Sequence, residues 1–279
     1  YRGIHGGRDV AVKKVRADPN VDREVKHLLA CEASHPNVIR YHTMVADDAS
    51  RYLVFEKCVG NLYDYIVKKT PSLDIKPMEI LRQTTEGLAH LHRNNIVHRD
   101  LKPQNVLFST SCGEARALIS DFGLSKEVDP QRGSVSMRIG FEGTMIWMAP
   151  EAIQKKMNSY PMDIFSLGCI FYFVLTEGSH PFGDLKRTCL SYHELIPHLS
   201  YHEIALSYRL IELSLSHSPI ERPTATAILK LPYFWDTEST LEFFGNVSIF
   251  LISVNFPEII KTLRRNICKE NQKCEHKWS

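Results

Sequence analysis

The stretch His98-Arg99-Asp100-Leu101-Lys102-Pro103-Gln104-Asn105 decides the fold of this chain, together with Asp121-Phe122-Gly123 further along. The first stretch places a carboxylate, a lysine and an amide on one short loop, and the second adds another carboxylate. Taken singly, each carboxylate is explained equally well by a solvated surface charge or by a helix cap. Fixed residues at fixed spacing rarely combine by chance, so the joint pattern indicates one built site.

Both stretches resemble signature motifs of the protein kinase family, the catalytic loop H-R-D-L-x-x-x-N and the metal-binding D-F-G. The resemblance implies that Asp100 accepts the proton of an incoming hydroxyl and that Lys102 stabilises the transferring phosphate. It also implies that Asn105 and Asp121 bind Mg²⁺ beside the phosphates of ATP. The expected reaction is phosphoryl transfer from ATP to a protein hydroxyl.

A lysine-bearing strand precedes these motifs. Val10-Ala11-Val12-Lys13 is β-branched and follows the turn-like stretch His5-Gly6-Gly7-Arg8. It resembles the kinase strand whose lysine contacts the α- and β-phosphates of the nucleotide. The helical spacing of residues 21–29 offers Glu24 as the ion-pair partner of Lys13. A solvated lysine at a strand end is the alternative, and the position upstream of the catalytic loop favours the kinase interpretation.

Two further strands are predicted over residues 36–41 and 51–55, and they lead into Glu56-Lys57-Cys58. The kinase resemblance implies that Glu56 and Cys58 belong to a hinge whose backbone groups pair with the adenine edge. Phe55 would guard the back of that pocket, and an ordinary core aromatic is the compatible alternative.

Helical spacing predicts helices over residues 61–66, 77–94 and 163–175. The last of these is strongly apolar, so the carboxylate of Asp163 requires buried partners, which we expect from the backbone of the catalytic loop.

Four further side chains receive a place from the same resemblance. Leu107 and Leu118 flank the metal-binding segment and are expected to form the floor of the nucleotide site. Arg222 lies near the end of the kinase pattern and is expected to pair with Glu151.

An activation segment is expected between the metal-binding motif and Glu151. Its residues Ser134 and Ser136 lie among basic residues, and phosphate groups there would pair with Arg99 and order the segment. Two solvated loop serines are the alternative. Gly143-Thr144 and Trp147-Met148 fit the part that receives the substrate hydroxyl.

Bulk properties exclude several classes of protein. The 279 residues are 43% hydrophobic and 24% charged, which is typical of a soluble globular chain with a substantial core. With 34 basic and 32 acidic residues, net charge gives no argument for nucleic-acid or membrane binding. The 7 cysteines are scattered, which favours a reducing compartment over a disulfide framework. The longest apolar run, residues 164–175, is too short to span a membrane.

A narrower resemblance is to the inositol-requiring endoplasmic-reticulum stress sensors, which are bifunctional kinases and endoribonucleases. It rests on Asp22-Arg23-Glu24-Val25, Gln83-Thr84-Thr85-x-Gly87-Leu88-Ala89-His90-Leu91-His92, Ile119-Ser120-Asp121-Phe122-Gly123-Leu124, Glu177-Gly178-Ser179-His180-Pro181-Phe182-Gly183, Tyr233-Phe234-Trp235 and Leu241-x-Phe243-Phe244-x-Asn246-Val247-Ser248. The resemblance implies a parent protein at the cytosolic face of the endoplasmic-reticulum membrane, while this chain alone is cytoplasmic. It further implies self-phosphorylation in homodimers and cleavage of an RNA by the parent.

The predicted fold is therefore α+β, a bilobal kinase fold followed by a short helical stub. We expect a small lobe over residues 1–58, a large lobe over 59–235 and the start of a nuclease domain over 236–279. The small lobe lacks the Gly-rich loop, which would precede Tyr1, so a fragment of a longer protein is expected. Asp236 and Thr237 are expected to cap the stub's first helix.

The sequence leaves three candidate functions. The leading one is a Ser/Thr protein kinase that uses ATP and Mg²⁺ and has itself as a substrate. The second is a scaffold whose ATP- or ADP-bound shape controls dimerisation with little turnover. The third, an active ribonuclease, is disfavoured because the nuclease residues of the family are expected beyond this chain. Arg265 and His276 are the residues of the stub that would have to carry such an activity.

Overall fold

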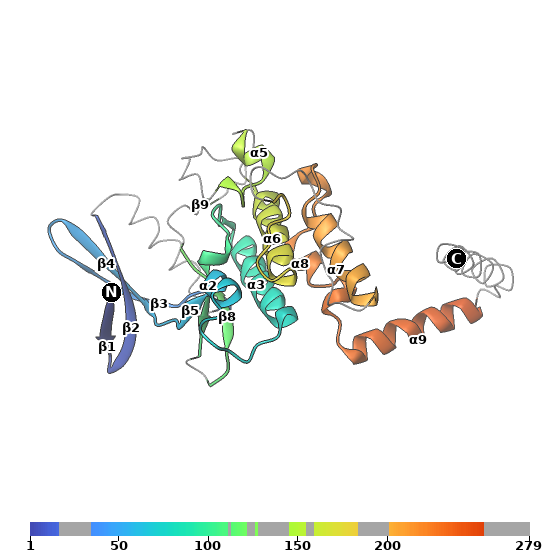
Figure 1. Ribbon diagram of the computed structural model, residues 1–279, viewed down its shortest axis with the longest axis horizontal. Helices are drawn as coiled ribbons and strands as arrows, with labels where there is room; N and C mark the ends of the chain where they lie inside the picture. The colour runs from blue at the N-terminus through green and yellow to red at the C-terminus, as the bar shows by residue number, and fades with distance from the viewer. Residues whose placement is uncertain are drawn as a thin grey trace. The chain divides into compact units, whose positions relative to one another are not determined.

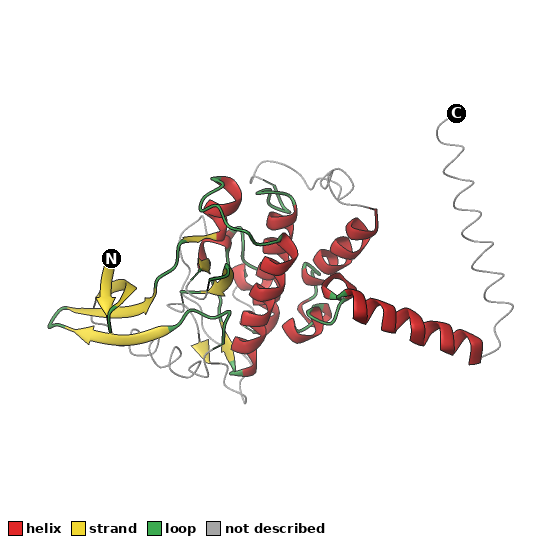
Figure 2. Cartoon of the chain, turned by 90° about the horizontal axis from the view of Figure 1, so that it is seen from below, coloured by secondary structure: helices red, strands yellow, loops and turns green. Residues whose placement is uncertain are grey.

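The computed structural model describes residues 1–16, 35–110, 113–121, 126–127, 145–154, 159–183 and 201–253 of the chain (Figure 1). The chain consists of two compact units, Tyr1–Phe234 and Trp235–Ser279. The first unit combines antiparallel sheets with a separate group of helices, which confirms the predicted α+β class (Figure 2). The predicted border between two lobes at residue 58 stays a prediction.

A four-stranded antiparallel sheet opens the first unit, with the strand order β1-β2-β4-β3. The strands are β1 Arg2–His5, β2 Arg8–Arg16, β3 Tyr41–Ala46 and β4 Ser50–Glu56. Gly6 and Gly7 join β1 to β2 with φ angles of 55° and 74°. These left-handed angles are the ones that a tight two-residue hairpin requires, so the predicted turn is confirmed.

The strand predicted over residues 36–41 is wrong for most of its length, because β3 begins only at Tyr41. The preceding residues run beside a different sheet, where Val38 forms a parallel bridge with Ile119. The Ile39 amide donates to the Ile119 carbonyl at 2.9 Å, and the Ile119 amide donates to the Asn37 carbonyl at 2.9 Å. The β-branched stretch therefore forms a strand-like contact, but its partner is β8 and not the large sheet.

Most of the helices of the first unit follow its large sheet in the chain. They are α2 Leu62–Val67, α3 Pro77–Arg93, α5 Pro150–Ile153, α6 Tyr160–Leu175, α7 Tyr201–Ser214 and α8 Ala225–Ile228, with single 3-10 turns η1 Pro103–Asn105, η3 Pro219–Glu221 and η4 Pro232–Phe234. The predictions for α2, α3 and α6 are confirmed to within a few residues. The helices α3 and α6 pack side by side (Figure 1). All residues of α6 from Met162 to Val174 are buried, so this helix forms the centre of the core.

The predicted ion pair between Glu151 and Arg222 is present and buried. Arg222 donates from Nη1 and Nη2 to the two carboxylate oxygens, at 2.5 and 3.0 Å. Its Nη1 also donates to the Pro161 carbonyl, and its guanidinium lies over the Phe165 ring. This arginine therefore joins α5 to the start of α6.

Two small antiparallel sheets lie between the large sheet and the helices. One has the order β5-β7-β8, with β5 Gly60–Asn61, β7 Val106–Ser109 and β8 Arg116–Ile119. The other pairs β6 Ile96–Val97 with β9 Lys126–Glu127. The β7–β8 hairpin follows the catalytic-loop stretch and leads directly to Asp121, so it sets the distance between the two motifs.

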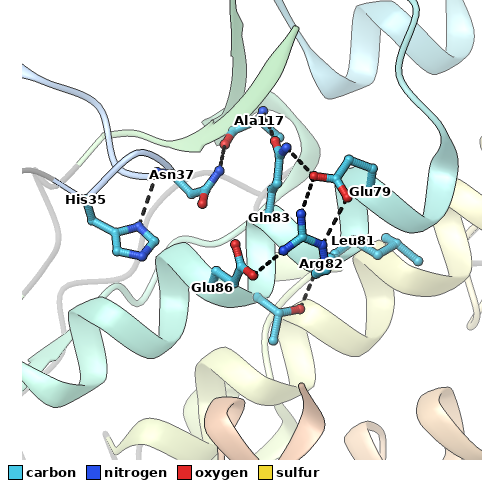
Figure 3. A network of polar contacts seen from close by, with 9 residues as sticks. His35, Asn37, Glu79, Leu81, Arg82, Gln83, Glu86 and Ala117 are labelled. Atoms are coloured by element: carbon cyan, nitrogen blue, oxygen red, sulfur yellow. Dashed lines mark hydrogen bonds and ion pairs between the residues drawn. The ribbon is translucent and has the colours of Figure 1, made fainter. Parts of the chain in front are cut away.

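The outer edge of β8 is closed by backbone bonds at Ile119 and by side chains at Ala117 (Figure 3). The Ala117 amide donates to Oε1 of Gln83 at 2.7 Å, and the Ala117 carbonyl accepts from Nδ2 of Asn37 at 3.0 Å. Gln83 belongs to α3, and Gly87, one turn later, lies against the Asn37 backbone. A β-carbon on Gly87 would overlap the Asn37 carbonyl oxygen. Only glycine allows this approach, which fixes α3 against both β8 and the residues before β3.

The second unit contains the helix α9 Thr237–Ser253. Oδ1 of Asp236 accepts the Ser239 amide hydrogen at 2.7 Å, which confirms the predicted cap. The side chains of Leu241 and Phe244 on this helix are exposed within their own unit. Among the described residues, no helix combines the length and the apolar character that a membrane span requires.

Candidate active site

Asp163, in the first turn of α6, holds the backbone that precedes Asp100. Its Oδ2 accepts the His98 amide hydrogen at 2.8 Å, and its Oδ1 accepts that of Arg99 at 2.8 Å. The residue is 1% exposed, so the predicted need for buried partners on the catalytic loop is confirmed. Because two consecutive amides point at one carboxylate, the loop has a single orientation here.

His92 from α3 is a third partner of this carboxylate, with Nε2 lying 2.9 Å from Oδ2 of Asp163. Burial opposes the ionisation of Asp163, but hydrogen bonds from His92 and from the Arg99 amide outweigh it and hold its pKa below the ordinary value. The carboxylate therefore stays ionised while it holds the loop.

Ser120 ties the catalytic loop to the second motif. Its carbonyl oxygen lies 2.8 Å from Nε2 of His98, and its amide donates to the Asn105 carbonyl at 2.9 Å. Its hydroxyl donates to the same carbonyl at 3.0 Å. Since Ser120 directly precedes Asp121, these bonds fix the position of Asp121 relative to Asn105.

Asp100 is a buried carboxylate with one occupied and one open oxygen. Oδ2 accepts from Nζ of Lys102 at 2.7 Å and from Nδ2 of Asn105 at 3.1 Å. Oδ1 is buried and has no hydrogen-bond partner among the described residues. Asn105 also donates to the Asp100 carbonyl at 2.7 Å, so the loop closes on itself. A buried acceptor without a donor costs free energy, which is recovered when a donor such as a substrate hydroxyl binds.

Lys13, on β2, reaches Asp121 across the site, with 2.9 Å between Nζ and Oδ1. The two side chains are 39% and 47% exposed, so this ion pair is weak and readily exchanged for ligand contacts. The predicted partner of Lys13, Glu24, lies outside the described residues, and that pair stays a prediction.

Two residues of the motifs have backbones in the left-handed region. The φ angle is 71° at Arg99 and 65° at Asp121, and neither residue is glycine. Such angles are uncommon for residues with a side chain and gather at functional sites. Here they turn the chain immediately before Asp100 and at Asp121 itself.

A cavity of about 460 Å³ is lined by most of the predicted nucleotide-binding residues, but not by Asp100 or Lys102. Its lining includes Lys13, Phe55, Glu56, Cys58, Asn105, Leu107 and Asp121. This volume suits a nucleotide-sized ligand. Leu118 is fully buried and does not line the cavity, so its predicted place at the floor is wrong. Leu118 pairs with Leu107 across the two strands, so both side chains share one face of the sheet, but only Leu107 reaches the cavity.

Other lining residues were missed from the sequence. Ala11 follows from the two-residue alternation of β2, because it shares a face with Lys13. Ile39 and Gln104 carry no such signal, since contacts distant in sequence bring them there. At the hinge, burial and the neighbouring Glu56 charge raise the pKa of the Cys58 thiol to about 12, so it remains protonated.

A second cavity, of about 550 Å³ and mostly apolar, lies beside the end of the expected activation segment. Met148 lines it, together with Met145, Pro150 and Phe182. Trp147 is instead 5% exposed and packs edge-on against Phe173, so it belongs to the core and does not receive the substrate. Gly143 and Thr144, and the proposed phosphosites Ser134 and Ser136, lie outside the described residues, as do Arg265 and His276.

Comparison with known proteins gives the family and its relatives. The protein kinase domain family matches residues 1–234. The chain is 45% identical, over 89% of its length, to the serine/threonine-protein kinase/endoribonuclease ire-1 of Caenorhabditis elegans. It is 40% identical, over 90% of its length, to the human serine/threonine-protein kinase/endoribonuclease IRE2.

A third relative is the sensor for unfolded proteins in the ER ire1 of Schizosaccharomyces pombe, 37% identical over 89% of this chain. The matched regions cover 27%, 28% and 26% of the three relatives, so the chain spans about a quarter of their length. These relatives agree with the stress-sensor resemblance drawn from the sequence.

Proposed function

We propose, from the premise that this chain belongs to the protein kinase family, that it transfers the γ-phosphate of ATP to serine and threonine hydroxyls of proteins. One observation carries the proposal. Lys13, Asn105 and Asp121 line the hinge cavity, and Asn105 donates to Asp100, whose Oδ1 is a buried acceptor without a hydrogen-bond partner among the described residues. A hydroxyl entering beside the nucleotide supplies that donor.

Asp100 and Lys102 are the proposed catalytic residues. Asp100 takes the proton of the substrate hydroxyl, and the hydroxyl oxygen bonds to the γ-phosphorus. At the same time, the bond between that phosphorus and the oxygen that bridges it to ADP breaks. The bridging oxygen leaves on ADP with the electron pair. Lys102, which contacts Asp100 at 2.7 Å, exchanges this contact for the transferring phosphate and stabilises its charge.

Lys13 is the proposed contact for the α- and β-phosphates. Its present partner, Asp121, is a carboxylate, so phosphate oxygens replace one anionic partner with another. Glu24 is the proposed second partner of Lys13. The backbone groups of Glu56 and Cys58 are the proposed contacts for adenine, and Leu107 packs beneath the ring.

The residues present fit Mg²⁺. No group of three His, Cys, Asp or Glu side chains that could hold a metal occurs among the described residues. Mg²⁺ does not need one, because it is usually held by one or two carboxylates together with substrate phosphates and water. Asp121 and Asn105 are the proposed ligands. Bound Mg²⁺ supplies positive charge against the phosphate oxygens.

The proposed substrate is a second copy of the protein, in the setting of an endoplasmic-reticulum sensor for unfolded proteins. The name of the Schizosaccharomyces pombe relative, a sensor for unfolded proteins in the ER, supports this setting. The proposed acceptors are Ser134 and Ser136, and the apolar cavity beside Met148 gives a substrate segment a place to lie. The location of the parent at the cytosolic face of the membrane belongs to the same proposal.

The test uses purified protein, Mg²⁺ and radiolabelled ATP, with Asp100→Asn as the inactive variant and Asp74→Asn, at an exposed position, as its control. We expect label transfer to wild type and to the control, and none in Asp100→Asn, with ATP binding retained in all three. Undiminished transfer by Asp100→Asn would refute the role of the base. ATP binding without transfer in wild type would favour the scaffold instead.

A further inference from the structure

The side chain of Glu56 forms a cluster of contacts, although the proposed hinge contacts with adenine involve only its backbone. Glu56 ends β4 and is 8% exposed. Its carboxylate is therefore shielded from solvent and accepts hydrogen bonds from three protein donors instead. Oε1 accepts the Arg40 amide hydrogen at 2.8 Å, while Oε2 accepts from the Ser109 hydroxyl at 3.2 Å and from Nη2 of Arg116 at 2.7 Å.

Arg116 extends this cluster to the chain that precedes β3. Its Nη1 donates to the Pro36 carbonyl at 2.6 Å, while Nη2 donates to Glu56. The guanidinium is 22% exposed, and its planar fork holds both acceptors at once. One arginine on β8 therefore joins the end of β4 to the residues that run beside β8.

The hinge is anchored at both ends on the same hairpin. Before it, the Glu56 carboxylate contacts Ser109 on β7 and Arg116 on β8. After it, the Val59 amide donates to the Phe108 carbonyl at 2.8 Å, and Gly60 pairs with Phe108 in the small sheet. Only the two residues between these anchors span the gap.

We propose that Arg116 is a positioning residue for nucleotide binding, acting through the Glu56 carboxylate. This rests on the proposed function, in which backbone groups of the hinge bind adenine. The β7–β8 hairpin also leads to Asp121. The Glu56–Arg116 pair thus holds the proposed adenine contacts at a fixed distance from the carboxylate of Asp121. The two ends of the ATP site are therefore aligned before ATP binds. Arg116 touches neither the nucleotide nor the reacting atoms.

The test compares Arg116→Met with wild type, using calorimetric titration of Mg²⁺-ADP and steady-state phosphorylation. We expect the Kd for ADP and the KM for ATP to rise about three- to tenfold, the range for losing preorganisation of a few groups. The kcat should change little, because Asp100 and its supports are untouched. Arg116→Lys, which keeps the charge, should recover part of the affinity.

Arg209→Met is the matched control, since Arg209 pairs with Glu212 on the surface of α7. It should bind ADP as wild type does. Because Arg116→Met leaves the buried Glu56 charge unpaired, the double variant Glu56→Gln/Arg116→Met is the second test. It removes both charges, and its affinity should stay low even where its Tm recovers.

Wild-type affinity for ADP in folded Arg116→Met or in the folded double variant would overturn the proposal. An equal loss of ADP affinity in Arg209→Met would also overturn it. A fall in kcat with unchanged KM would also contradict it, because positioning of the hinge acts on binding. Failure of the wild-type protein to bind nucleotide at all would instead remove the proposed function, and this inference with it.

Discussion

Nε2 of His92 lies 2.9 Å from Oδ2 of Asp163, and the same carboxylate receives the backbone amides of the catalytic loop. This contact links α3, α6 and the loop in one buried cluster. The loop before Asp100 therefore owes its shape to a residue more than sixty positions later in the chain.

Asp163→Asn tests this support. The side-chain nitrogen of the new asparagine would face a backbone N–H of the catalytic loop. One buried donor would then lack an acceptor. We expect destabilisation of about 1–3 kcal/mol and a loss of transfer rate of up to about 100-fold from misplacement of Asp100. Urea unfolding and label transfer measure the two effects. Normal kcat in the folded variant would show that the loop does not need Asp163.

Gly87→Ala should destabilise the first unit although alanine is the better helix former. The new β-carbon would overlap the Asn37 carbonyl oxygen, so α3 and the residues before β3 must separate. We expect a cost of about 1–3 kcal/mol, as for other overpacked sites. Gly245→Ala on α9 is the control, because a β-carbon there meets nothing within 4 Å. Thermal unfolding should show a lower Tm only for Gly87→Ala, and an unchanged Tm would disprove the close packing.

Asp121→Ala should weaken nucleotide binding only when Mg²⁺ is present. The substitution removes a proposed metal ligand, but it also removes the carboxylate that now contacts Lys13 at 2.9 Å. Without metal, Lys13 is then more available to phosphate, so affinity should not fall. Calorimetric titration with ATP, in Mg²⁺ and in EDTA, separates the two effects. Equal losses under both conditions would argue against metal binding by Asp121.

Stability should fall as the pH drops from about 6.5 toward 4, in part through His180. Burial lowers the pKa of its imidazole from 6.5 to about 4, so in this window the unfolded chain binds a proton that the folded chain does not. Discounted for partial exposure, the effect is about 1–2 kcal/mol. Both His180→Phe and His180→Gln should flatten the dependence of the urea midpoint on pH, whatever their absolute stability. A slope equal to that of wild type in both variants would exclude His180 as a cause.

Ser134 and Ser136 should be the main phosphosites after self-phosphorylation. Each phosphate adds a charge of about −1.5 to −2 among Arg132 and Arg138, where it can form charge-assisted hydrogen bonds. Phosphopeptide mapping of protein incubated with ATP measures this directly, with Asp100→Asn protein as the unmodified control. Two empty serines in a sample phosphorylated elsewhere would contradict the prediction.

Sequence reasoning succeeded where information is local. The helix predicted over residues 77–94 has a clear apolar period, and α6 is recognisable from an unbroken apolar run. The motif spacing also led to Asn105 and Asp121, which line one cavity, and to Asp100, which accepts a hydrogen bond from Asn105. In each case, neighbours in the chain carry the pattern.

Contacts between distant residues could not be predicted in this way. Residues 36–41 have the composition of a strand, but their partner is β8, and nothing in the stretch names that partner. The contact of Arg116 with Glu56 joins residues that no periodicity relates. Leu118 shares a face of the small sheet with Leu107, so the strand pattern could not show that only Leu107 reaches the cavity.

The side chains of Gln83 and Asn37 have a consequence for the behaviour of the protein in concentrated solution. An edge strand with open N–H and C=O groups is a template on which a foreign strand can grow. At Ala117 both groups are already taken, so the strand that leads to Asp121 does not offer this position to another molecule. Replacing either side chain with alanine would leave one of these buried backbone groups without its partner.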